Sequence, residues 1–170
     1  MKSDYDTTYL AQRDAFRNLC ADFAPPNKKD QIALAAADEF DRLVKSQVFP
    51  QVAIREGLVL ARTRFVWIPT KDKVYRLGEY LVEIGEHYFS AHNLTKTVSE
   101  YHHPHINAAG NVCMRDGREE IMQMIKEGWL ARAMWGVESA LWIVDTSSQY
   151  PAGGLEKWPV EPDGKEKGND

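Results

Sequence analysis

The segment from Tyr101 to Met114 gathers the residues of this chain that are best suited to covalent chemistry. It reads Tyr-His-His-Pro-His-Ile-Asn-Ala-Ala-Gly-Asn-Val-Cys-Met, with three of the five histidines and one of the two cysteines. A cysteine thiolate is a nucleophile and a metal ligand. Proline and glycine mark the segment as a loop, and loops held by rigid elements commonly display reactive side chains. Cys113 is therefore the candidate reactive thiol.

The histidines around Pro104 are candidates to assist this thiol. Pro104 fixes the backbone between His103 and His105. The imidazole of His105 can donate a hydrogen bond through either ring nitrogen, and as an imidazolium it stabilises a thiolate. The adjacent His102 and His103 point to opposite sides of an extended segment, so at most one of them joins His105.

Helices and strands on both sides are expected to position this loop. Apolar periodicity predicts helices over residues 3–23 and 30–44. β-Branched and aromatic residues predict strands over 57–68 and 74–84, and residues 87–90 with 94–99 can supply a third, which suggests an antiparallel meander. Helices are predicted again over 119–127 and 129–143. The inward face of the second helix is predicted to comprise Ile32, Leu34, Ala35, Phe40, Leu43 and Val44.

Length and composition predict a single domain, and the order of the predicted helices and strands makes it an α+β domain. The 170 residues, 44% hydrophobic, suffice for one core. We divide the chain into an N-terminal helical segment at 1–50, a core at 51–158 and a flexible polar tail at 159–170. Cys20 lies on the apolar face of the first helix, so we expect a buried thiol and no disulfide with Cys113.

Charge and hydropathy narrow the classes of partner and compartment. The net charge is -4 and no basic stripe is present, which argues against nucleic-acid binding. The apolar runs are too short to cross a bilayer, and the N-terminus lacks the apolar centre of a signal peptide. A cytoplasmic protein without membrane partners is expected.

With this order of elements, the loop resembles the signature of ubiquitin-conjugating enzymes. In that family a His-Pro-Asn tripeptide precedes Gly-x-Ile/Val-Cys-Leu around the catalytic cysteine. Here His103-Pro104-His105 precedes Gly110-Asn111-Val112-Cys113-Met114. Residues 75–84 are similar to the second strand of the family, and the resemblance covers roughly residues 57–150. The substitution of His105 for asparagine fits a divergent, prokaryotic or viral, member.

The resemblance implies a fold, an activity and a set of residue roles. The fold would be the ubiquitin-conjugating type, an antiparallel meander with N-terminal helices, a cysteine-bearing loop and C-terminal helices. Cys113 would receive a ubiquitin-like modifier from its activating enzyme as a thioester and transfer it to an amine of a protein target, without a cofactor. His105 would stabilise the oxyanion or the loop, His103, Pro104 and Gly110 would shape the loop, and Asp116 or Asp145 would orient or deprotonate the amine.

Three alternatives stay open at this point. The spacing His103-x-His105, seven residues, Cys113-x-x-Asp116 resembles the JAMM metalloprotease motif with cysteine in place of serine, in which two histidines and the aspartate bind zinc and an upstream glutamate such as Glu56 or Glu79 acts as base. Such an enzyme would remove modifiers. A plain zinc site would use His102 or His103 with His105 and Cys113. A non-catalytic interaction or scaffold module of the same fold would use none of this chemistry.

Overall fold

The computed structural model describes residues 4–114, 117–147 and 149–161 and confirms the α+β class. The elements in chain order are α1 (Asp4–Phe23), η1 (Pro26–Lys28), α2 (Lys29–Lys45), β1 (Gln51–Arg55), β2 (Leu58–Arg62), β3 (Val66–Pro69), β4 (Val74–Gly78), β5 (Tyr80–Gly85), β6 (Tyr88–Asn93), α3 (Gly117–Lys126), α4 (Leu130–Ala140), η2 (Pro151–Gly153) and η3 (Leu155–Lys157). No helix in these ranges combines the length and apolar character needed to cross a membrane.

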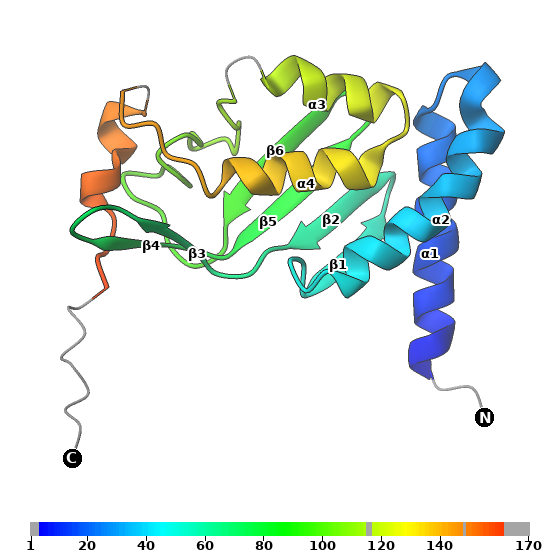
Figure 1. The fold of residues 1–170 in the computed structure, drawn as a ribbon, viewed down its shortest axis with the longest axis horizontal. Coiled ribbons are helices and arrows are strands. Elements are labelled where there is room, and N and C mark those ends of the chain that lie inside the picture. The colour runs from blue at the N-terminus through cyan, green and yellow to red at the C-terminus, as the bar shows by residue number, and fades with distance from the viewer. Residues whose placement is uncertain (1–3, 115–116, 148, 162–170) are drawn as a thin grey trace.

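The main sheet is an antiparallel meander with a hairpin inserted into it. Its strand order is β1-β2-β5-β6, and β3 and β4 form a separate two-stranded sheet between β2 and β5 in the chain. Figure 1 shows α3 and α4 across one face of the main sheet, with α1 and α2 beyond β1 at one end. The segment after β6 therefore runs past the end of the sheet before it returns as α3.

Each of the two long predicted strands is in fact two strands in different sheets. Residues 57–68 divide into β2 and β3 because Thr63 bends the chain: its hydroxyl accepts a hydrogen bond from the Tyr80 amide at 3.0 Å and donates one to the Arg64 carbonyl at 2.8 Å. Residues 74–84 divide into β4 and β5 after Gly78, whose φ of 126° requires glycine. The third predicted strand is confirmed only in its first part, because β6 ends at Asn93 and residues 94–99 are not a strand. β1 was not predicted.

The ranges predicted for the two N-terminal helices are confirmed, but one residue of the predicted inward face of the second helix is wrong. Phe16 of α1 packs on Phe40 of α2 with ring centroids 5.3 Å apart, and Cys20 is buried as expected. Leu34 is wrong as an inward residue, since 79% of it is exposed and Ala36 is buried instead. At about 100° per residue, Leu34 lies roughly 200° around the helix from buried Ile32.

The last residues that the structure describes pair with the β3–β4 hairpin. Residues 159–161, which the sequence analysis places in the tail, lie along β4. The Arg76 amide donates to the Pro159 carbonyl at 2.7 Å, and the Glu161 amide donates to the Val74 carbonyl at 2.9 Å. Residues 162–170 of the tail lie outside the described ranges.

Candidate active site

The cysteine-bearing loop is anchored by apolar side chains on either side of an exposed turn. Ile106 and Val112 pair across the loop and are buried. Between them the side chain of Asn107 accepts hydrogen bonds from the amides of Ala109 and Asn111, both at 3.0 Å. Because successive side chains of an extended segment point to opposite sides, inward Val112 leaves Cys113 pointing outward. Cys113 is exposed and has a free thiol.

His103 is a buried residue that connects the cysteine-bearing loop to the end of α4. It has no exposed surface. Its Nε2 lies 3.1 Å from the carbonyl oxygen of Leu141, and its Nδ1 accepts a hydrogen bond from the His105 amide at 3.1 Å, so Nε2 carries the proton. Burial lowers the pKa of His103 to about 3. The ring is therefore neutral and joins the loop to the end of α4.

His105 contacts both the cysteine-bearing loop and the segment after α4. Its carbonyl accepts a hydrogen bond from the Cys113 amide at 2.8 Å, and its Nε2 accepts one from the Asp145 amide at 3.0 Å. In the neutral ring the proton therefore sits on Nδ1, which is the nitrogen able to donate. His105 is 8% exposed, so its ring has a fixed position between the loop and the segment after α4.

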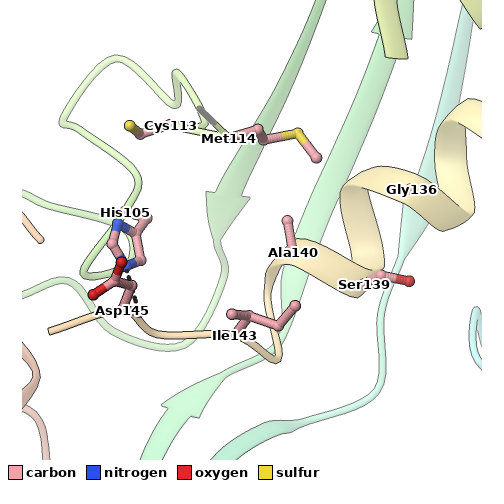
Figure 2. Close-up of a pocket in the computed structure, with 8 residues that line it drawn as sticks. All are labelled: His105, Cys113, Met114, Gly136, Ser139, Ala140, Ile143 and Asp145. Atoms are coloured by element: carbon pink, nitrogen blue, oxygen red, sulfur yellow. Dashed lines mark hydrogen bonds between the residues drawn. The ribbon is translucent and has the colours of Figure 1, made fainter. Parts of the chain in front are cut away.

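A cleft of about 370 Å³ opens beside Cys113. Figure 2 shows Cys113 and Met114 on one side, His105 and Asp145 on a second, and the end of α4 on a third. The lining residues are His105, Cys113, Met114, Gly136, Ser139, Ala140, Ile143 and Asp145. Most of these are small or apolar, so Cys113 borders a hollow able to receive a carbonyl and the chain attached to it.

Of the two acidic candidates, the structure brings Asp145 to the cleft. Its Oδ1 accepts hydrogen bonds from the amide and the hydroxyl of Ser147, at 2.9 and 2.6 Å. The carboxylate is thereby held in the cleft wall, while the backbone amide of the same residue holds His105. Asp116 lies outside the described residues.

Pro104 and Gly110 shape the loop in different ways. The Pro104 carbonyl accepts a hydrogen bond from the Tyr150 amide at 2.9 Å, which ties the loop to the segment after α4. Gly110 has a φ of 79°, and a Cβ there would lie 2.3 Å from Cε1 of His92. Only glycine permits this close approach.

Sequence reasoning missed Tyr150, whereas His92, expected to be a surface or packing residue, packs beside the loop. The Tyr150 ring lies 5.1 Å from that of Tyr101, and burial, with smaller contributions from the negative charges of Cys113 and Tyr101, raises its pKa. The rings of His92 and His102 are nearly perpendicular, at 81°, with centroids 5.0 Å apart. His102 Nδ1 accepts from the Asn93 amide at 3.0 Å, so that ring faces β6. No spacing pattern in the sequence indicated these contacts.

The zinc alternatives that use His103 are opposed by its hydrogen bonds. Both of its ring nitrogens are engaged with the backbone, so neither offers a lone pair to a metal. Glu79, one of the candidate bases, pairs with Arg62. Among the described residues, no group of three or more histidine, cysteine, aspartate or glutamate side chains is arranged to hold a metal ion.

Comparison with known proteins gave no relatives: no family profile, curated protein or solved structure matched this chain.

Proposed function

We propose that this protein is a conjugating enzyme for a ubiquitin-like modifier, with Cys113 as the acyl carrier. The observation that supports it best is an exposed thiol on the rim of a cleft whose wall contains an imidazole fixed by hydrogen bonds. Acyl transfer needs an accessible nucleophilic sulfur and a donor near the carbonyl oxygen. Cys113 and His105 supply these two groups.

The proposed reaction has two balanced steps. The Cys113 thiolate attacks the thioester carbonyl of the modifier carried by its activating enzyme, and that enzyme's thiolate leaves. An amine of the target protein then attacks the new thioester, an amide bond forms, the Cys113 thiolate leaves, and the amine gives up a proton. His105 would donate through Nδ1 to the oxyanion in both steps. The Asp145 carboxylate would attract the amine or take its proton.

Thioester formation tests the proposal without requiring the natural activating enzyme. Ubiquitin bearing a C-terminal mercaptoethanesulfonate thioester is mixed with the protein, and the products are separated without and with reductant. A reductant-sensitive adduct is expected with the wild type and with Cys20→Ala, whose sulfur is buried, but not with Cys113→Ala. An adduct that forms equally in Cys113→Ala would refute the assignment.

The same experiment distinguishes the non-catalytic alternative. An interaction or scaffold module would leave Cys113 unacylated, although the loop would still be held in place by His103 and Pro104. Failure of the wild type to form the adduct, together with slow alkylation of Cys113 by iodoacetamide, would therefore favour that module over the enzyme.

A further inference from the structure

The β3–β4 hairpin carries a concentration of positive charge on an acidic protein. Residues 64–76 contain four cations, Arg64, Lys71, Lys73 and Arg76, and one anion, Asp72, for a net charge of +3. Since the whole chain has a net charge of -4, the remainder carries -7. All four cations are exposed, and none of them forms an ion pair within the described ranges. Arg64 lies close enough to Glu138 to favour that carboxylate's charged form, so Lys71, Lys73 and Arg76 are the charges most available to a partner.

An exposed aromatic side chain lies among these cations. Trp67 of β3 is 45% exposed and is paired across the hairpin with Arg76 of β4. Its ring centroid lies 5.6 Å from that of Phe65, and the guanidinium carbon of Arg76 lies 5.2 Å from the Phe65 centroid. Tryptophan and arginine are the residues most often found at the energetic centres of protein interfaces.

The hairpin also presents an open strand edge. β4 is paired on one side with β3 and on the other with residues 159–161. β3 makes no backbone hydrogen bond to any strand but β4 in the part of the chain that the structure describes. The hairpin lies at the opposite end of the molecule from α1 and α2 (Figure 1). An open edge offers backbone donors and acceptors to an added strand.

We propose that the outer edge of β3 binds an extended acidic segment of a partner polypeptide by strand addition. The partner backbone would pair with β3, its carboxylates would lie near Lys71, Lys73 and the arginines, and an apolar side chain would cover Trp67. The acidic remainder of the chain disfavours a long nucleic acid, which would extend beyond the hairpin, whereas a short acidic segment fits within it. This surface is separate from the Cys113 cleft.

Peptide binding to the full chain tests the proposal. The probe is a fluorescein-labelled peptide of alternating glutamate and valine, followed by fluorescence anisotropy at low ionic strength. Two matched peptides serve as controls: one with glutamine for glutamate, and one with alternate backbone amides methylated to remove hydrogen-bond donors. The acidic peptide should bind at least about tenfold more tightly than either control, and its binding should weaken as salt is added.

Substitutions in the hairpin then locate the surface. Lys71→Glu with Lys73→Glu, and separately Trp67→Ala, should each weaken peptide binding by about tenfold while leaving the thermal unfolding temperature close to that of the wild type. The matched control, Lys29→Glu with Lys45→Glu at the two ends of α2, changes the net charge equally and should leave the affinity within about twofold.

Three results would overturn the proposal. The first is equal binding of the acidic and glutamine peptides, or no binding of either. The second is a single-stranded oligonucleotide that binds the hairpin more tightly than the acidic peptide, which would make nucleic acid the occupant. The third is a concentration-dependent dimer that the hairpin substitutions dissociate, which would make a second copy of this chain the occupant.

Discussion

The backbone amide of Asp145 donates a hydrogen bond to Nε2 of His105 over 3.0 Å. This contact joins the segment after α4 to the cysteine-bearing loop and fixes the imidazole proton on Nδ1 when the ring is neutral. The chemistry proposed for His105 therefore depends on a segment far from it in the sequence. The site exists only when α4 has been packed against the sheet.

Replacement of His105 should slow both the loading of Cys113 and the transfer to an amine. Loss of a hydrogen-bond donor to an oxyanion typically lowers a rate by about 100-fold, so we expect that effect for His105→Ala in single-turnover discharge of the thioester to free lysine. His105→Asn retains a donor and should lose less activity. His87→Ala, at a surface position, serves as the control. Discharge by His105→Ala at the wild-type rate would contradict the role given to His105.

The two cysteines should differ sharply in reactivity. Cys20 is fully buried, and burial raises its pKa to about 12, so near neutral pH it is a protonated and inaccessible thiol. Iodoacetamide should modify Cys113 alone in the native protein and both cysteines in urea, as measured by mass spectrometry of proteolytic fragments. Comparable labelling of both cysteines in the native protein would show that the packing around α1 is wrong.

Burial of His103 should make the protein less stable as the pH is lowered. The pKa of His103 is about 3 in the folded protein and 6.5 ordinarily, so between these values the unfolded chain binds a proton that the native protein does not. The contribution of His103 to the free energy of unfolding is complete above pH 6.5. It declines by about 1.4 kcal/mol per pH unit as the pH falls toward 3. Urea unfolding at several pH values measures this slope.

The matched variant for that measurement is His103→Gln, which cannot take up a proton in this range. It should be less stable than the wild type at neutral pH because the Leu141 carbonyl and the His105 amide lose a well-placed partner. Its free energy of unfolding should depend less steeply on pH below 6.5. Identical slopes for the two proteins would mean that His103 is not buried in its neutral form.

A methyl group at Gly110 should disturb the loop more than the same change at Gly57. Both residues have positive φ, 79° and 76°, but a Cβ at Gly57 meets nothing within 4 Å, whereas one at Gly110 collides with His92. Gly57→Ala should cost about 1 kcal/mol from backbone strain alone, and Gly110→Ala about 3 kcal/mol. Only the latter should alter the alkylation rate of Cys113. Equal losses in urea unfolding would contradict the close packing of Gly110 on His92.

The sequence predicted the elements in which apolar residues recur at a regular spacing. The helices at both ends follow from apolar spacing, and the exposure of Cys113 and burial of Cys20 follow from their local contexts. The division of the long strands was not predictable from alternation, because it depends on a contact between Thr63 and Tyr80 across the sheet. The prediction for Leu34 is wrong because hydrophobicity alone does not give the angle of a residue around the helix axis.

The sequence predicted the local half of the site, and the family resemblance added Asp145, which lies in the cleft. His103, His105 and Cys113 are close in sequence, so their proximity followed from the loop. The contacts of Asp145 with His105 and of Tyr150 with Pro104 are made by backbone amides, which carry no signal in residue type. A residue that acts through its amide is invisible to any analysis based on side-chain chemistry.

Transfer of a ubiquitin thioester to Cys113 tests the central claim most directly. The protein is mixed with ubiquitin mercaptoethanesulfonate thioester, and the intact mass is recorded before and after reductant. We expect one ubiquitin per chain, lost on reduction, absent from Cys113→Ala and present in Cys20→Ala. Absence of the adduct from the wild type, with Cys113 shown to be free, would contradict an acyl-carrying role for this sulfur.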